Sequence, residues 1–109
     1  MANAYKVLGQ ADLAATTDTN VYTVPAATEA VISTIIIANR TAAEESFRIA
    51  IRPAGATIAD QHYIAYGVPI AANDSTTLTL GISLAATDVL TVWASAVDLS
   101  VNVFGTEIS

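Results

Sequence analysis

The chain has no cysteine, and it has only four basic residues against ten acidic ones. Without cysteine it can form neither a disulfide framework nor a thiolate metal site. A net charge of −6 argues against binding to the phosphate backbone of nucleic acids, because such proteins concentrate lysine and arginine on one face. We therefore expect no nucleic-acid partner and no cofactor.

Long apolar runs and helical periodicity are also lacking. The longest apolar run, AVISTIIIA at 30–38, has the length of a strand, whereas a membrane helix needs ~18 apolar residues. The start MANAYKVLGQ has no apolar core behind basic residues, so we expect no signal peptide. No segment sustains an apolar period of 3.6 residues, and we expect essentially no helix.

Charged residues are scarce relative to apolar ones. They make up 13% of the chain and hydrophobic residues 53%, whereas an average globular domain has roughly 25% charged residues. A chain of 109 residues forms one domain, which we assign to 1–109, and buries roughly two-thirds of its unfolded surface. With so few charges to cover the remainder, part of that surface is expected to be buried against copies of the chain or a partner.

Strand signals recur along the whole sequence. Apolar and polar residues alternate between short turn signals, which is typical of strands with one buried face. We expect strands near 4–8, 20–24, 30–38, 46–52, 61–66, 76–84, 88–95 and 98–104. About eight short strands predict an all-β fold, a single antiparallel β-sandwich that is jelly-roll-like. The segment 30–38 has apolar residues on both of its faces. We therefore expect a central strand that is covered on both sides.

The stretch DVLTVWASAVDLSVNVFG at 88–105 predicts a hairpin of two strands. Its polar-looking face carries Trp93 and Phe104. Either a neighbouring loop covers these rings, or they are interface anchors, as aromatics flanked by small polar residues often are. The scarcity of charge favours the interface.

Two arginines, Arg48 and Arg52, are expected on the outer face of one strand, because Phe47, Ile49 and Ile51 alternate with them. They could pair locally with Glu44 and Glu45. Alternatively, their guanidinium groups could bind carboxylates on a partner.

Three segments, at 25–30, 70–75 and 84–89, share two alanines followed by a small polar residue and an acid. Turn chemistry explains this pattern, because Asp and Asn hydrogen-bond their own backbone. A cation site built from Glu29, Asp74 and Asp88 is the alternative. We expect Asp74 at the opposite end of the sandwich from the other two, and we predict no metal.

Catalytic signatures are weak. His62 is the single imidazole, and no G-x-S-x-G elbow accompanies it. Glu44 and Glu45 are neighbours on a turn, whereas glycosidase carboxylates face each other across a substrate. The glycines do not cluster into a phosphate cradle. We expect a protein that is not an enzyme and has no catalytic residues.

From Lys6 to Gly105 the chain, with runs such as YTVPAATEAVISTIIIANRT and HYIAYGVPIAANDSTTLTLGISLAATDVLTVWAS, resembles small β-sandwich virion proteins of tailed bacteriophages. The resemblance implies a viral structural protein of the capsid cement or decoration type, made in the host cytoplasm and carried on the virion. It implies a homo-oligomer, with a trimer favoured, that binds the major capsid protein or another virion protein, and no membrane. A tail, baseplate or fibre component is the alternative within this class.

A carbohydrate-binding sandwich module is the alternative from another class. Tyr5, Tyr63 and Tyr66 could stack on a sugar ring or add to a protein interface.

Overall fold

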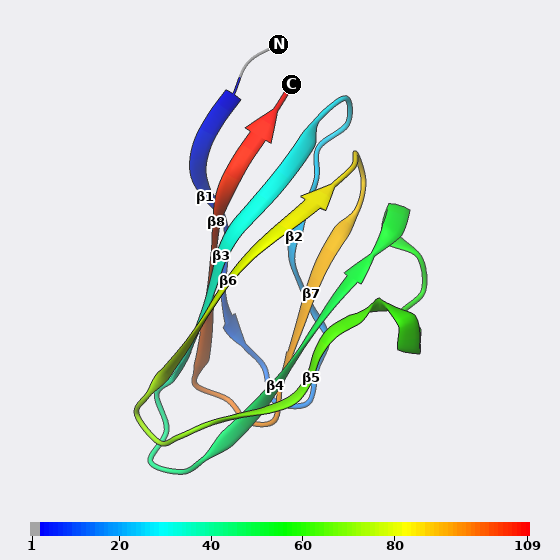
Figure 1. The fold of residues 1–109 in the computed structure, drawn as a ribbon. Coiled ribbons are helices and arrows are strands. Elements are labelled where there is room, and N and C mark those ends of the chain that lie inside the picture. Colours follow the sequence, from blue (N-terminus) through cyan, green and yellow to red (C-terminus); the bar gives the residue numbers. More distant parts are fainter. Residues whose placement is uncertain (1–2) are drawn as a thin grey trace.

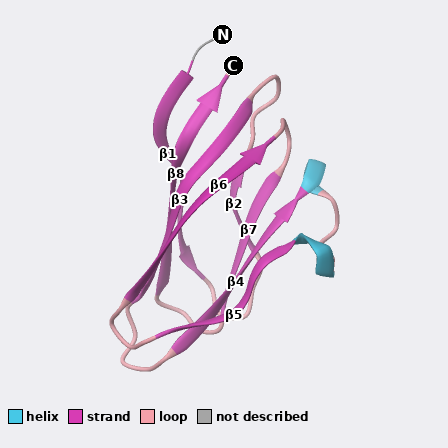
Figure 2. Cartoon of the chain, in the orientation of Figure 1, coloured by secondary structure: helices cyan, strands magenta, loops and turns pink. Residues whose placement is uncertain are grey.

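The computed structural model describes residues 3–109, which form two antiparallel four-stranded sheets packed face to face (Figure 1). The strands are β1 (Asn3–Leu13), β2 (Thr19–Thr23), β3 (Glu29–Asn39), β4 (Glu45–Arg52), β5 (Tyr63–Ile70), β6 (Ser75–Leu84), β7 (Val89–Ala94) and β8 (Leu99–Ile108). Two single 3₁₀ turns, η1 (Pro53–Gly55) and η2 (Asp60–His62), lie in the connection between β4 and β5 (Figure 2).

The fold is a β-sandwich of the jelly-roll type, as predicted, although the sequence did not predict the strand order. The first sheet has the order β1-β8-β3-β6 and the second β2-β7-β4-β5. The pairs β1 with β8, β2 with β7, β3 with β6 and β4 with β5 are therefore nested, as if one long hairpin had been rolled up. Only β4 and β5 are consecutive strands of one sheet, and every other connection crosses between the sheets.

The predicted hairpin at 88–105 is wrong, although both of its strands exist. β7 belongs to the second sheet and β8 to the first, and the residues at 95–98 cross the gap between them. Leu90 and Val92 on β7 and Val101 and Val103 on β8 all point inward and are fully buried. Alternation indicates which side of a strand is buried but not which strand lies beside it, because both sheets face the same core.

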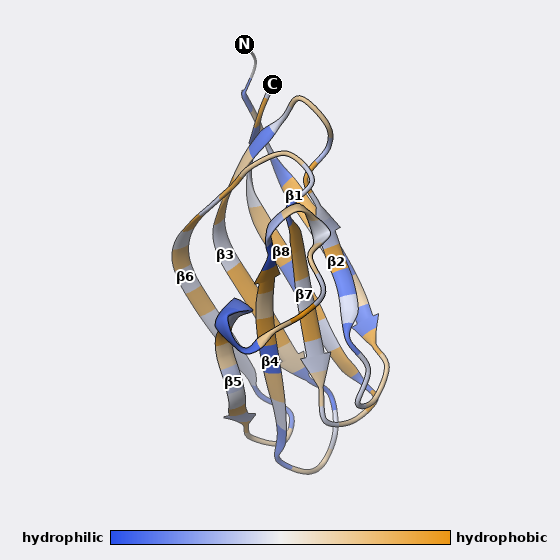
Figure 3. Cartoon of the chain, turned by 90° about the vertical axis from the view of Figure 1, so that its right-hand side faces the viewer, coloured by the Kyte–Doolittle hydropathy of each residue, from blue (hydrophilic) through white to orange (hydrophobic). Residues whose placement is uncertain are grey.

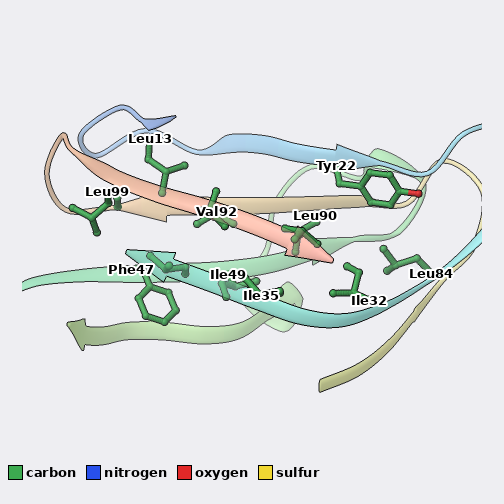
Figure 4. Close-up of a cluster of buried hydrophobic side chains, with 14 of the residues drawn as sticks. Leu13, Tyr22, Ile32, Ile35, Phe47, Ile49, Leu84, Leu90, Val92 and Leu99 are labelled. Atoms are coloured by element: carbon green, nitrogen blue, oxygen red, sulfur yellow. The ribbon is translucent and has the colours of Figure 1, made fainter. Parts of the chain in front are cut away.

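The core lies between the sheets and is built from alternate residues of each strand (Figures 3 and 4). Its fully buried side chains include Ile32, Ile35, Ile37, Phe47, Ile49, Leu90, Val92, Leu99, Val101 and Val103. The spacing from Ile32 to Ile35 breaks the period of two because β3 has a register shift between Ile32 and Thr34. This bulge lets both isoleucines face the core.

The expectation for 30–38 is half right. β3 is central, since it pairs with β8 on one side and β6 on the other. Its outer face is not covered within the chain: Val31 is 37% exposed and Ile36 is half-buried. The apolar residues on that face are therefore available to something outside the subunit.

The three similar segments form similar turns, which confirms the turn interpretation. Each segment contains one residue with a positive φ angle: Ala27, third in its segment, at 56°, and Asn73 and Thr87, fourth in theirs, at 54° and 70°. The amides of Asp74 and Asp88 close two of these turns by donating to the carbonyl three residues earlier.

These turns lie at both ends of the sandwich, as predicted. The turns after β2 and β6 are joined by backbone hydrogen bonds between Val24 and residues 87–88, whereas the turn after β5 bonds to Thr41 at the other end (Figure 1). Glu29 and Asp88 are thus separated from Asp74 by the length of the sandwich.

Asn39 fastens the end where β3 and β5 finish, a role that the sequence prediction missed. Its side chain is buried, and Nδ2 donates to the carbonyl oxygens of Ala43, Ile70 and Ala71 at 2.8, 3.1 and 3.2 Å. Oδ1 accepts from the amide and the hydroxyl of Thr41. The Asn-x-Thr spacing after an apolar run is the available signal, because Asn caps such turns through its side chain.

Candidate interaction site

The outer face of the second sheet carries a stacked row of three side chains. Arg48 on β4 lies opposite Trp93 on β7 and Tyr66 on β5. Its guanidinium carbon is 3.9 Å from the centroid of the Trp93 ring and 4.3 Å from that of Tyr66. The planar cation is held between two aromatic rings, an arrangement favoured by the ring quadrupoles.

Local features of β5 set the position of Tyr66 in this row. The register of β4 and β5 shifts so that Phe47 pairs with Val68 and Arg48 with Tyr66, which leaves Gly67 as a bulge with a φ angle of +66°. The Tyr63 ring meets the Tyr66 ring edge-on at 4.9 Å. We call Arg48, Trp93, Tyr66 and Tyr63 the arginine cage.

Arg48 makes no side-chain hydrogen bond within residues 3–109, and its Nε atom is buried without a partner. The other three basic side chains of the sequence all have partners within residues 3–109. Lys6 binds Glu107, Arg40 binds Asp12, and Arg52 makes several hydrogen bonds.

Arg52 lies on the same outer face as Arg48, as predicted, but its guanidinium is used inside the chain. Nε donates to the Thr91 hydroxyl at 3.1 Å and Nη2 to Asn20 Oδ1 at 2.8 Å, while Nη1 donates to the carbonyl oxygens of Gly55 and Ala56. These bonds fasten the turn that follows β4 onto the sheet and bury Thr91, although Thr91 points outward. Contact of Arg52 with a partner stays an untested prediction, whereas its structural role is visible.

Local pairing of Arg48 and Arg52 with Glu44 and Glu45, one of the two alternatives above, is not found among the ion pairs of residues 3–109. Arg40, which opens the turn that holds these glutamates, also pairs elsewhere: its Nη2 lies 2.7 Å from Asp12 and 3.9 Å from Asp98. The reason is the sheet order: Arg40 follows β3, and its neighbour β8 begins directly after Asp98.

Trp93 and Phe104 lie on opposite sides of the molecule, because β7 and β8 belong to different sheets. Arg48 covers one face of Trp93. Phe104 is half-buried on the outer face of the first sheet, between Val7 on β1 and Thr34 on β3. The two rings therefore cannot anchor one common surface.

Three rows of paired residues form the middle of the outer side of the first sheet, a surface that we call the first-sheet face. The rows are Tyr5, Thr106, Val31 and Ser83; Val7, Phe104, Thr34 and Thr79; and Gln10, Asn102, Ile36 and Thr77. None of these residues is charged. Tyr5 is 82% exposed and Val7 46% exposed, so the face presents apolar and aromatic surface with uncharged polar groups between.

His62 and the acidic residues form no metal site in the part of the chain that the structure describes. No group of three or more His, Cys, Asp or Glu side chains is close enough to hold a metal ion in residues 3–109. The imidazole Nδ1 of His62 accepts a hydrogen bond from the Ala59 amide at 3.1 Å, which closes η2. Within the same residues, no helix is long and apolar enough to cross a membrane.

A polar bridge joins the two sheets near the chain ends. The Tyr22 hydroxyl donates to Glu107 Oε2 at 2.6 Å, and Lys6 Nζ lies 2.7 Å from Oε1. The hydrogen bonds from Lys6 and Tyr22 lower the pKa of Glu107. Burial, together with the neighbouring carboxylate, raises the pKa of Tyr22.

Glu107→Gln is expected to lower the free energy of unfolding at neutral pH by about 1–2 kcal/mol, the contribution of charge-assisted hydrogen bonds. The loss should disappear in acid. Because the folded pKa is depressed, this stability is present above the ordinary carboxyl value of 4.5 and is lost as pH falls through the lower folded pKa. Urea unfolding from pH 7 to pH 2.5 should show the two proteins converging in acid. Glu44→Gln, on an exposed turn residue, is the control, and an equal effect in both variants contradicts the assignment.

The molecule is thus an eight-stranded jelly-roll sandwich with two dissimilar outer sides, one with the first-sheet face and one with the arginine cage. Comparisons with protein-family models, with curated proteins and with solved structures gave no match.

Proposed function

We propose that this protein is a non-enzymatic structural protein of a bacteriophage particle, of the capsid cement or decoration type, which binds the assembled shell as a homo-oligomer. The jelly roll supports this proposal only in part, because viral capsid proteins, lectins and cupins share that fold. The composition and the exposed surfaces are therefore the evidence that distinguishes a viral structural protein from a lectin or a cupin.

The observation that carries the proposal is the first-sheet face. In a chain with a net charge of −6, the three rows of this face bring no like charges together when two copies meet. The whole outer side of the sheet, whose strands have 10 or 11 residues and lie about 4.8 Å apart, has about 600 Å². Beyond the three rows this side also carries Glu29 at one end and Asp12, paired with Arg40, at the other. Burying the whole side in two copies, and not the three rows alone, reaches about 1,200 Å², the lower end of specific protein interfaces. We assign it to contact between copies of this chain.

The geometry of that contact decides the symmetry of the oligomer. Two copies that meet through the same face form a two-fold dimer. The trimer that the resemblance favours requires the first-sheet face of one copy to contact a different surface of the next. Light scattering coupled to gel filtration distinguishes these masses.

The test of the function mixes the purified protein with undecorated phage shells and measures co-sedimentation and the temperature of shell disruption. A protein that binds the assembled shell and not its separate subunits raises that temperature by mass action. An oligomer that engages several shell subunits gains avidity of about 10²–10⁴ without tighter single contacts.

The other outcomes identify the alternatives. Co-sedimentation with tails alone identifies a tail, baseplate or fibre component. Absence of co-sedimentation with either, together with binding to an oligosaccharide array, identifies a carbohydrate-binding module and overturns the proposal.

A further inference from the structure

We infer that the arginine cage is a binding site for a carboxylate side chain of a partner protein, with Arg48 as the group that binds it. The carboxylate site follows from the geometry of this chain alone. Only the identity of the partner, an acidic residue of the shell protein, rests on the proposed function.

The guanidinium of Arg48 has a fixed position. Trp93 and Tyr66 hold the Arg48 guanidinium between them at 3.9 and 4.3 Å, and Tyr63 supports Tyr66 edge-on. An exposed arginine loses much side-chain entropy when it binds a partner, and a guanidinium already clamped by two rings loses less. The cage therefore pre-organises Arg48 for recognition.

The guanidinium of Arg48 also has unused hydrogen-bond donors. A guanidinium carries five N–H donors and no acceptor, and those of Arg48 have no hydrogen-bond partner within residues 3–109. Nε is buried without a partner, whereas the terminal amino groups are not among the buried unpaired atoms of residues 3–109. A carboxylate approaching end-on can accept two parallel hydrogen bonds from these groups.

No acidic side chain of residues 3–109 forms an ion pair with Arg48. The ion pairs of residues 3–109 involve Lys6 and Arg40 only, although the chain has ten acidic residues. The fold thus pairs or hydrogen-bonds its other cations and leaves the caged one for an external anion.

The surroundings favour a protein over a sugar as the source of the carboxylate. One face of Trp93 and one face of Tyr66 are already occupied by the guanidinium, so a sugar ring cannot stack there. Tryptophan, tyrosine and arginine are the residues most enriched at the energetic centres of protein interfaces. Here all three are neighbours in one row across the strands.

The test uses the emission of Trp93, which is the single tryptophan of the chain and is in contact with Arg48. Sodium acetate is titrated against sodium chloride at equal ionic strength, with acetamide as a neutral analogue. We expect a saturable change in emission with acetate and none with chloride or acetamide. The change should be lost in Arg48→Gln and weakened in Arg48→Lys, which keeps the charge but lacks the planar fork.

Arg52→Gln is the matched control, because that side chain lies on the same strand face and already has its partners. It should keep the acetate response. Circular dichroism of each variant checks that the sandwich is intact. Identical effects of acetate and chloride, or a response that survives in folded Arg48→Gln, overturn the site, as does a saturable response to neutral N-acetylglucosamine but not to acetate.

Shell binding separates this inference from the proposed function. Arg48→Gln should lower shell affinity at least tenfold without changing the oligomer mass. An acetate response without shell binding overturns the function and leaves the site, whereas normal shell binding by Arg48→Gln overturns the inference and leaves the function.

Discussion

Gly105→Ala is expected to destabilise the fold by about 3 kcal/mol or more, at the upper end for overpacking a closed site. A β-carbon at this position would collide with the backbone carbonyl oxygen of Val31 and would lie 3.1 Å from the Ile32 Cα and 2.9 Å from the Leu8 side chain. β8 is hydrogen-bonded to β1 on one side and β3 on the other. Neither neighbour can withdraw without breaking the ladder.

Two other glycines serve as controls for this substitution. Gly81 has nothing within 4 Å of an added β-carbon and no positive φ, whereas Gly67 is equally open but has a φ of +66°. Gly81→Ala should therefore change stability by less than about 0.5 kcal/mol, and Gly67→Ala should cost about 1 kcal/mol through backbone strain. Urea unfolding midpoints of the three variants, measured in parallel, compare their stabilities. Equal midpoints for Gly105→Ala and Gly81→Ala would refute the steric argument.

Alternation predicted the strands well because it reports burial directly. All eight expected strands are present, and β3, β4 and β6 begin and end within one residue of their predicted limits. The largest errors are the end of β1, predicted at residue 8 and observed at Leu13, and the limits of β5, predicted at 61–66 and observed at Tyr63–Ile70. Bulges at Ile64 and Gly67 disturb the period of β5, and η2 occupies its predicted start.

The pairing of strands could not be predicted from alternation, because the alternation within a strand does not depend on which strand lies beside it. The error of a hairpin at 88–105 had a functional consequence, since it placed Trp93 and Phe104 on one surface. The outward direction of Arg48 followed from Phe47 and Ile49, but its cage depends on Tyr66, which reaches the row through a bulge. The candidate site is therefore predictable in its residue types and not in its assembly.

The first-sheet face provides the second large expected effect, on self-association. Val7→Asp would place an unpaired carboxylate beside Phe104, in the middle row of the proposed contact, in every copy, at a cost of about 3 kcal/mol or more. That corresponds to a dissociation constant at least a hundredfold higher. Val7 is 46% exposed in the single chain, so the fold itself should tolerate the change.

Ile64→Asp is the matched control, because Ile64 is 47% exposed and lies on β5, an edge strand of the second sheet, as Val7 lies on β1 at the edge of the first. Sedimentation equilibrium should show Val7→Asp as a monomer at concentrations where the original chain and Ile64→Asp associate. Phe104→Ala should weaken association and Trp93→Ala should not, since their rings are on opposite faces. If Trp93→Ala and Ile64→Asp dissociate the oligomer while Val7→Asp does not, the copies meet through the second sheet. If the original chain is a monomer at about 100 µM, the first-sheet face does not bind a second copy.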